Sequence, residues 1–227
     1  VADAWLGNYQ TINQAWHGVD SPTPIDKDGA HGTHTAGTVL GLDPATNDTI
    51  GVAFNAYVMA TDPIVTDLAD IKPLPEYIDV FEFALNPDGD TATTNDIPDA
   101  INNSWGIDTH DDTTICAGYI TQMFDALEAA GIANVYSAGN EGPGGTTIGQ
   151  PQYVSTGLVN TFTVGAVNGA NPAFPITNFS SHGPTICNVP AGPLKIKPEV
   201  VAPGLNVRSS VEDNNYALYN GTSMAGP

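Results

Sequence analysis

Positive charge is what this sequence has least of. Its 227 residues include five Lys and Arg against 25 Asp and Glu, which gives a formal net charge of −20. Such a charge repels polyanions and leaves no basic patch for a phosphate backbone, so nucleic acid is not an expected partner. An acidic surface with few lysines is typical of a soluble protein that works outside the cell, and we therefore expect secretion.

Long apolar runs and cysteines are scarce as well. No stretch approaches the length of apolar chain that spans a bilayer, so we expect no membrane span. Cys116 and Cys187 are the only cysteines, and they are compatible with one disulfide or with two buried thiols. The 41% hydrophobic content and the absence of low-complexity tracts indicate a single globular domain over residues 1–227.

The order of apolar patterns predicts an α/β fold. Helices are expected over residues 31–41, 75–85 and 114–131, the last with a clear apolar stripe. Strands are expected over these segments: 50–53, 56–60, 100–106, 132–137, 161–167 and 199–202. Alternating strands and helices predict a three-layer, doubly wound, mostly parallel sheet, whose ligands bind at the carboxyl ends of the strands. Ser104 and Asn140 both fall at such ends.

The small-residue loop at residues 221–227 carries a candidate nucleophile. Ser223 lies where a turn should enter a helix, and the first turn of a helix leaves N–H groups unpaired. A serine attacks a carbonyl only if a base takes its proton, and His31 in its glycine-rich segment is the strongest candidate. The developing oxyanion needs donors, for which the Ser223 N–H and the amide of Asn140 are candidates.

Six motifs stand in one order along the chain. They are His-Gly-Thr-His-Thr-Ala-Gly at 31–37, Asn-Asn-Ser-Trp-Gly at 102–106, Ser-Ala-Gly-Asn-Glu-Gly at 137–142, Phe-Ser-Ser-His-Gly-Pro at 179–184, Lys-Pro-Glu-Val-Val-Ala-Pro-Gly at 197–204 and Gly-Thr-Ser-Met-Ala-Gly-Pro at 221–227. This set resembles the ordered motifs of the subtilisin-like serine proteases, and within them the bacillopeptidase F type. The resemblance implies a subtilisin-like fold and a serine endopeptidase that acts on polypeptides, as a monomer and without a cofactor in the chemistry.

The resemblance also implies a role for each matching residue. His31 would be the general base and acid, Ser223 the nucleophile and Asn140 the oxyanion donor, with Thr222 as a secondary polar contact. Residues Ser104, Trp105 and Gly106 would form an extended edge that pairs with the substrate backbone. Ser137 and Gly139 would line the primary specificity pocket.

One part of the family pattern has no match here. The family's third catalytic residue is an aspartate that follows an apolar run and precedes Thr-Gly or Ser-Gly. Asp3, Asp20, Asp26 and Asp28 all stand in other contexts. We therefore interpret the chain as an internal fragment of a catalytic domain, truncated at both ends and inactive by itself. Losing that aspartate costs on the order of 10⁴-fold in serine proteases, subtilisin among them.

The sequence leaves two alternative functions open, and it also leaves open whether the protein binds calcium. The chain is alternatively a pseudoprotease that binds peptides along residues 102–106, or an esterase or acyltransferase with the same catalytic residues. Subtilases often bind calcium, but the acidic loops at 88–90 and 108–112 lack the spacing of a known ion loop and are interpreted as solvated faces. A structural calcium therefore remains possible with no assigned site, and no metal ligand is predicted; His34 is interpreted as a structural polar residue.

Overall fold

The computed structural model describes residues 15–26, 29–43, 45–64, 72–106, 113–189 and 192–227. The chain divides into two compact units, each described here by itself. Unit 1 comprises residues 1–98 and 208–217, and unit 2 comprises residues 99–207 and 218–227. In the described part of the chain no helix combines the length and apolarity that crossing a membrane requires.

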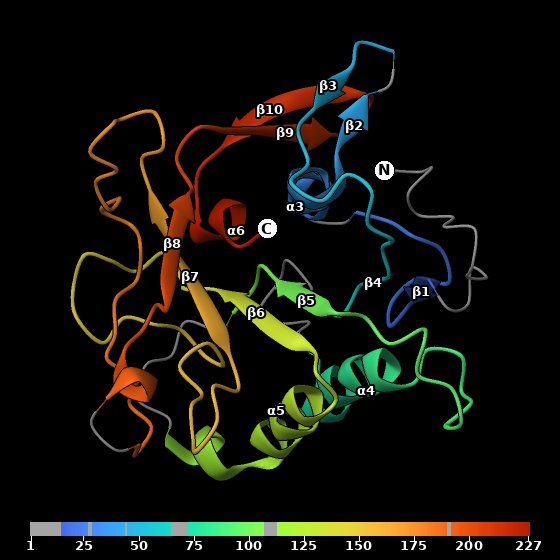
Figure 1. The fold of residues 1–227 in the computed structure, drawn as a ribbon, viewed down its shortest axis with the longest axis vertical. Coiled ribbons are helices and arrows are strands. Elements are labelled where there is room, and N and C mark those ends of the chain that lie inside the picture. Colours follow the sequence, from blue (N-terminus) through green and yellow to red (C-terminus); the bar gives the residue numbers. More distant parts are fainter. Residues whose placement is uncertain (1–14, 27–28, 44, 65–71, 107–112, 190–191) are drawn as a thin grey trace. The chain divides into compact units, whose positions relative to one another are not determined.

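A parallel sheet forms the centre of unit 2 (Figure 1). Among the described residues its four strands lie in the order β5 (Ala100–Asn103), β6 (Ala133–Ser137), β7 (Phe162–Val167) and β8 (Val200–Pro203), and every neighbouring pair is parallel. A 3₁₀ turn (Thr113–Ala117) and helix α5 (Tyr119–Ala129) connect β5 to β6. The predicted α/β class with a parallel sheet is confirmed, because strands joined through a helix pair side by side.

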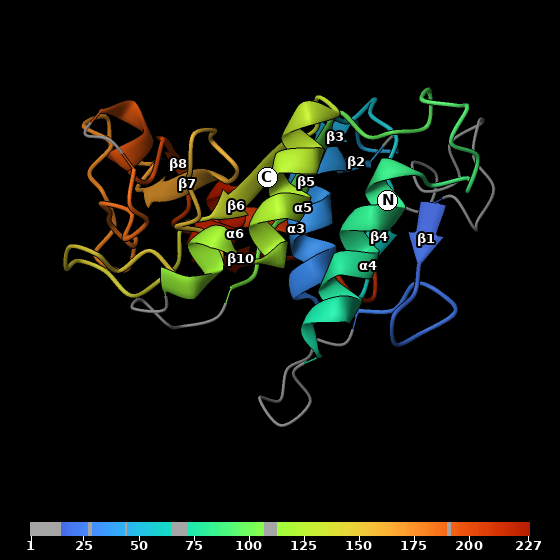
Figure 2. The same cartoon turned by 90° about the horizontal axis from the view of Figure 1, so that it is seen from below.

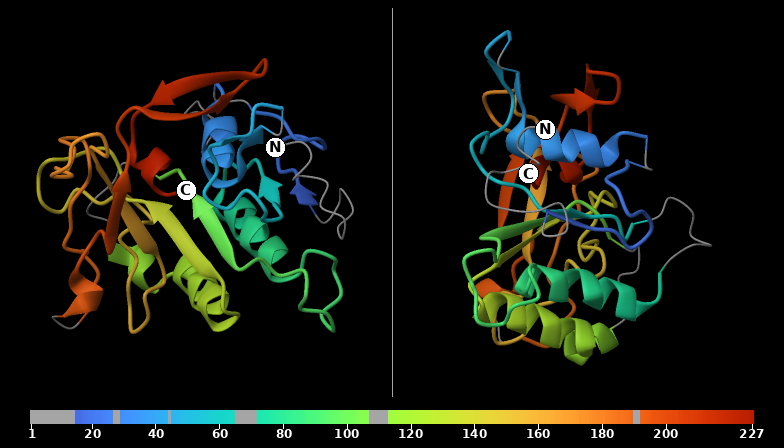
Figure 3. Two further views of the ribbon diagram at one scale, coloured as in Figure 1. Left: turned by 45° about the horizontal axis from the view of Figure 1, so that its top comes forward. Right: turned by 90° about the vertical axis from the view of Figure 1, so that its right-hand side faces the viewer.

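Helices cover the sheet of unit 2 on both faces. Tyr136 of β6 packs against Phe124 of α5, with ring centroids 6.0 Å apart. Its neighbour Val135 packs instead on a core that includes Val164 of β7 and Ala225 of helix α6 (Thr222–Ala225). Successive side chains of a strand point to opposite faces, so α5 and α6 lie on opposite sides of the sheet, as Figure 3 also shows. Figure 2 gives the view in which α5 lies over β6.

The described part of unit 1 contains two helices and several two-stranded pairings. Helix α3 spans His31–Leu40 and helix α4 spans Leu74–Leu85, as the apolar periodicity predicted. The short strands are β1 (Trp16–His17) paired with β4 (Ala60–Thr61), β2 (Leu42–Asp43) paired with β3 (Asp48–Thr49), and β9 (Val207–Val211) paired with β10 (Asn215–Tyr219). Residues 208–217 of the last pair belong to unit 1.

The strand predicted over residues 50–53 is wrong, since this segment forms turns. Its N–H groups pair with the end of α3 instead: Val52 N–H donates to Thr38 O at 3.1 Å, and Ala53 N–H donates to Val39 O at 2.7 Å. The last carbonyls of a helix have no partner inside it, and this apolar segment supplies one. Of residues 56–60, only Ala60 lies in a strand.

Two other boundaries differ from the prediction, and the structure decides the state of the two cysteines. The strand expected over 100–106 ends at Asn103, and the helix expected from 114 begins as the 3₁₀ turn before Gly118. Helix α5 gives way at Gly131, whose φ of 84° suits glycine. Cys116 and Cys187 form a disulfide that closes 71 residues of unit 2.

Candidate active site

Ser223 is the second residue of α6, so the helix cannot pair its N–H. The chain enters the helix through Gly221, whose φ of 156° favours glycine, and whose N–H donates to Gly204 O at 2.9 Å. The Ser223 side chain is largely buried, and its hydroxyl lies 3.4 Å from the main-chain oxygen of Ser104. A hydrogen bond of that length is weak, so it positions the hydroxyl near β5 and is easily given up when the hydroxyl reacts.

The side-chain amide of Asn140 is fixed by the start of α6. Its Oδ1 accepts the N–H of Thr222 at 2.9 Å and the Thr222 hydroxyl at 3.1 Å. Thr222 is fully buried, and its hydroxyl oxygen accepts a hydrogen bond from the Gly139 N–H at 3.1 Å. Because both contacts engage the oxygen, Nδ2 faces the other way and remains a donor on the exposed side of the loop.

A pocket of about 170 Å³ opens at the carboxyl ends of β5 and β6, entirely within unit 2. It is lined by Ser104, Trp105, Gly106, Ser137, Gly139, Asn140, Glu141, Gly149, Gln152 and Ser223. The structure therefore brings all but two of the sequence-predicted site residues to one pocket. Thr222 is one of the two, and it lies behind Asn140 as described above.

Three lining residues were missed by the sequence analysis: Glu141, Gly149 and Gln152. Glu141 directly follows Asn140, so its position after a strand end could have flagged it. Its Oε2 accepts the hydroxyl of Ser181 at 2.9 Å, and among the described residues of the lining it is the only charged side chain. Nothing in the sequence marked Gln152, which is 2% exposed and donates from Nε2 to Trp105 O at 3.0 Å.

The ring of Trp105 contributes to packing as well as to the pocket. It is half-buried, meets the ring of Tyr136 edge-on at 5.4 Å, and donates from Nε1 to Asn103 Oδ1 at 3.1 Å. Burial raises the pKa of Tyr136 well above its ordinary value, because a tyrosinate would lie in an apolar interior. The ring contact thus packs Trp105 against β6.

His31 is the first residue of α3 and belongs to unit 1. Its helix starts after Ala30, whose φ of 70° is left-handed, and receives its cap from Asp26. One oxygen of that carboxylate accepts both the N–H and the hydroxyl of Thr33, each at 2.6 Å. From β9, the Ser209 hydroxyl donates to His34 O at 2.8 Å. The first turn of α3 is therefore held firmly inside its own unit.

Some of the residues that the sequence offered as metal ligands lie in the described part of the chain, and others lie outside it. His34 is fully buried and its Nε2 lies 3.3 Å from Ala217 O, in keeping with a structural polar residue. Asp88 accepts the Asp90 N–H at 2.8 Å, and this bond lowers the pKa of Asp88. Residues 108–112 lie outside the described part of the chain, and among the described residues no group of three or more acidic, His or Cys side chains could hold a metal ion.

Comparison with known proteins identifies the family. A family model described as "Subtilase family" matches residues 7–227. The chain belongs to the subtilase family. The predicted resemblance to the subtilisin-like family is confirmed. As a subtilase chain it has its candidate nucleophile on α6 and its candidate base on α3, each at the start of a helix.

Individual relatives agree with the family match. Bacillopeptidase F of Bacillus subtilis is 36% identical to this chain, and the match covers 90% of this chain and 13% of bacillopeptidase F. Subtilisin of Bacillus pumilus is 32% identical, and that match covers 92% of this chain and 64% of the subtilisin. Among solved structures, the S41 Psychrophilic Protease superposes with a TM-score of 0.69 at 29% identity, covering 91% of this chain and 62% of that one. The chain thus spans less than two thirds of these relatives.

Proposed function

We propose that the protein containing this chain is a serine endopeptidase that hydrolyses peptide bonds through an acyl-enzyme. The observation that carries the proposal is the start of α6, where Ser223 lies on the same pocket as the fixed amide of Asn140. A nucleophile beside a preset donor is the arrangement that acyl transfer needs, because negative charge develops on the carbonyl oxygen as the bond forms.

The mechanism assigns one step to each residue. His31 takes the proton of the Ser223 hydroxyl as that oxygen attacks the peptide carbonyl. The oxyanion accepts hydrogen bonds from the Ser223 N–H and from Asn140 Nδ2. His31 then gives its proton to the leaving amine, and water releases the acyl group by the same route in reverse. Thr222 supports this sequence by holding Asn140 Oδ1 from below.

A polypeptide substrate fits the pocket and its rim. Residues 104–106 follow β5 without continuing it as a strand, and all three line the pocket, so a bound peptide would lie beside this edge. The side chain before the scissile bond would enter the pocket past Ser137 and Gly139. Gly139 has a φ of 106°, and a Cβ there would lie 2.4 Å from Glu141 Oε2, so glycine keeps this wall open.

Serine-directed chemistry tests the proposal. The full-length protein should react with a fluorophosphonate probe and cleave a peptide amide, and Ser223→Ala should abolish both. Hydrolysis of an ester without cleavage of the amide would favour the esterase alternative. Peptide binding without labelling or cleavage would favour the pseudoprotease.

We also propose that residues 1–227 alone are inactive, because no aspartate in them matches the family's triad motif. The same probe applied to this segment and to the full-length protein tests this point. Equal labelling rates would contradict it. We further propose that the protein works outside the cell as a monomer, without a cofactor in its chemistry. Its acidic surface and the Cys116–Cys187 disulfide support an oxidising, extracellular setting.

A further inference from the structure

Residues 152–154 are buried beside the pocket and belong to no helix or strand. Gln152 is one of the residues that line the pocket, and we call residues 152–154 the wall segment. A buried main-chain carbonyl needs a hydrogen-bond donor, and in a helix or a sheet a backbone N–H supplies it. The wall segment has no such ladder, so its carbonyl oxygens depend on side chains.

The side chain of Thr161, directly before β7, serves two of these three carbonyls. Thr161 is fully buried, and its hydroxyl lies 2.7 Å from Gln152 O and 2.8 Å from Val154 O. Among the described residues, no other group donates to these two oxygens. The carbonyl between them, that of Tyr153, accepts the hydroxyl of Thr185. One threonine hydroxyl therefore holds both ends of the wall segment.

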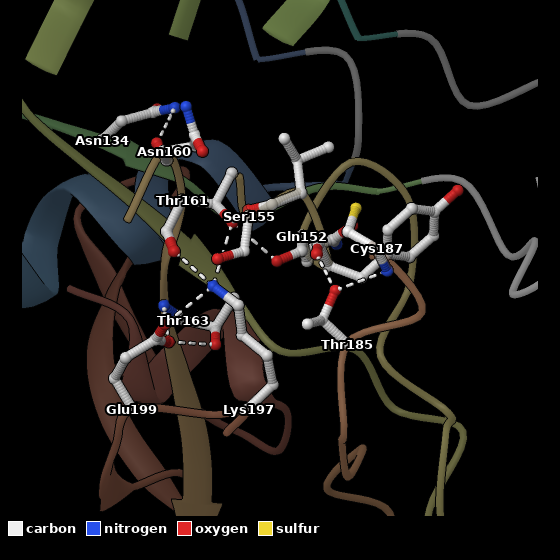
Figure 4. Close-up of polar contacts among 12 residues, drawn as sticks. Asn134, Gln152, Ser155, Asn160, Thr161, Thr163, Thr185, Cys187, Lys197 and Glu199 are labelled. Atoms are coloured by element: carbon white, nitrogen blue, oxygen red, sulfur yellow. Dashed lines mark hydrogen bonds and ion pairs between the residues drawn. The ribbon is translucent and has the colours of Figure 1, made fainter. Parts of the chain in front are cut away.

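A buried ion pair fixes the direction of the Thr161 hydroxyl (Figure 4). The side chain of Lys197 is fully buried, and its Nζ lies 2.7 Å from Glu199 Oε1. The same Nζ donates to Thr161 Oγ1 at 3.2 Å and also to Thr161 O. An ammonium group has donors only, so the threonine oxygen accepts from it and the hydroxyl proton points toward the wall segment. Glu199 Oε2 in turn accepts the Thr163 N–H of β7 at 2.7 Å, which anchors the ion pair.

The side chain of Gln152 connects the wall segment to the edge of the pocket. Its Nε2 donates to Trp105 O at 3.0 Å. Gly106 packs so closely against it that a Cβ on this glycine would lie 2.0 Å from the same nitrogen. Trp105 and Gly106 line the pocket beside the proposed path of the peptide. A shift of the wall segment would therefore displace the surface on which a substrate lies.

We infer that Thr161 is a positioning residue for substrate binding, which acts through Gln152 on residues 104–106. This inference rests on the proposed endopeptidase function. Thr161 is fully buried, so it acts through another residue and does not contact a substrate itself. Without its hydroxyl, two buried carbonyls would lose their donor, and the wall segment would shift to regain one. Residues 104–106 would then leave the position that fits a bound peptide.

Two substitutions of Thr161 in the full-length protein separate its hydroxyl from its packing. Thr161→Val keeps the volume and loses the hydroxyl, so KM for an extended peptide amide should rise about tenfold with kcat little changed. A rise in KM alone indicates lost binding that substrate and transition state share. Thr161→Ser keeps the hydroxyl and loses a methyl group, and it should retain the KM of the unaltered protein. A KM that rises at least as much in Thr161→Ser as in Thr161→Val, or that rises in neither, would overturn the inference.

The matched control is Thr121→Val on α5. Thr121 is 5% exposed and its hydroxyl donates to Ile115 O, so this variant loses the same kind of buried bond on the sheet face opposite α6. It should keep KM unchanged, although urea unfolding should show a loss of stability similar to that of Thr161→Val. A comparable rise of KM in Thr121→Val would show that lost stability alone raises KM, and would refute the role of Thr161.

Lys197→Met tests the part that the ion pair plays. It should raise KM as well, because the ammonium no longer directs the Thr161 hydroxyl toward the wall segment. Effects of residues that act through one another do not add, so the double variant with Thr161→Val should have the KM of Thr161→Val alone. Two effects that multiply would overturn the role of Lys197 in orienting the hydroxyl.

Binding to the Ser223→Ala variant separates this inference from the endopeptidase proposal. Calorimetry with the same peptide needs no turnover, and adding Thr161→Val should weaken binding about tenfold, whereas adding Thr161→Ser should not. If the unaltered protein cleaves no peptide but this difference in affinity holds, the endopeptidase function fails and the role of Thr161 stands. If the peptide is cleaved and neither KM nor affinity changes in Thr161→Val, the role of Thr161 fails alone.

Discussion

The starts of α3 and α6 solve the same structural problem with different chemistry. Neither helix is capped by the side chain of its own N-cap residue, Ala30 or Gly221. Each takes an acceptor from elsewhere: α3 uses the carboxylate of Asp26, and α6 uses the amide oxygen of Asn140, 82 residues before Thr222. One cap is an acceptor only, and the other has a donor left over.

The difference suits the charge that each helix start must tolerate during the proposed reaction. The N-terminus of a helix disfavours a cation, and a carboxylate there offsets the dipole near the imidazolium that His31 would form. Beside Ser223 the developing charge is negative, so a carboxylate cap would repel it, whereas an amide caps the helix and donates from Nδ2. The comparison teaches that a cap and a catalytic donor can be one side chain only if it is neutral.

The largest expected effect comes from removing either catalytic side chain. His31→Ala and Ser223→Ala should each lower kcat by on the order of 10⁶, and the double variant should be no worse than either alone, because the two residues act as a unit. That magnitude is the one measured in subtilisin, a member of this family. Single-turnover kinetics of the full-length protein check it. Losses that multiply in the double variant would show that the two helix starts act independently.

The second largest effect on kcat is expected when the neutral cap of α6, Asn140, is replaced by a charged one. Asn140→Asp keeps an acceptor for Thr222 but replaces the donor by a negative charge, so kcat should fall by about 10²–10³ or more with little change in stability. The range of about 10²–10³ is that of losing one such donor in subtilisin itself. Paired kinetics and urea unfolding provide the measurement. A variant that loses stability in proportion to activity would mean that Asn140 acts mainly as a cap.

Removing the cap of α3 should lower the free energy of unfolding. Asp26→Ala removes the acceptor of the Thr33 N–H and hydroxyl and should lower the free energy of unfolding by about 1 kcal/mol. Asp26→Asn is the matched control, since its amide oxygen can still accept the N–H, and it should lose less. Urea denaturation of the full-length protein measures both. Equal losses would point to the charge of Asp26, rather than its geometry, as the cap.

The smallest expected effect is a pH dependence in unit 2. Burial lowers the pKa of Lys197 below its ordinary 10.5, although Glu199 opposes the shift. Between the folded and unfolded pKa values the unfolded chain holds more protons, so the unfolding free energy should rise with pH in the alkaline window below 10.5. Lys197→Met should remove this rise and Lys195→Met should keep it, as urea unfolding between neutral pH and about pH 10 would show. Parallel curves for Lys197→Met and the unaltered protein would contradict it.

Much of the fold was readable because its signals are local. The apolar stripe of α5, the helix ends at Gly41 and Gly131, and the strands β6 and β7 follow from periodicity and turn residues. The strand predicted for the apolar segment 50–53 was wrong. Such a run can pair as a strand or donate to the last carbonyls of a helix, and which of the two it does depends on the segment that packs beside it. The short strand pairs of unit 1 carry no periodicity long enough to detect.

Sequence alone determined the family, the fold class and the candidates His31, Ser223 and Asn140, since ordered motifs and strand ends are properties of neighbouring residues. Tertiary structure decided the Cys116–Cys187 disulfide, the fixed orientation of the Asn140 amide and the place of Gln152 on the pocket. Each of these joins residues tens of positions apart. A hydrogen bond or a covalent bond between them depends on folded distance, and no local pattern encodes that distance.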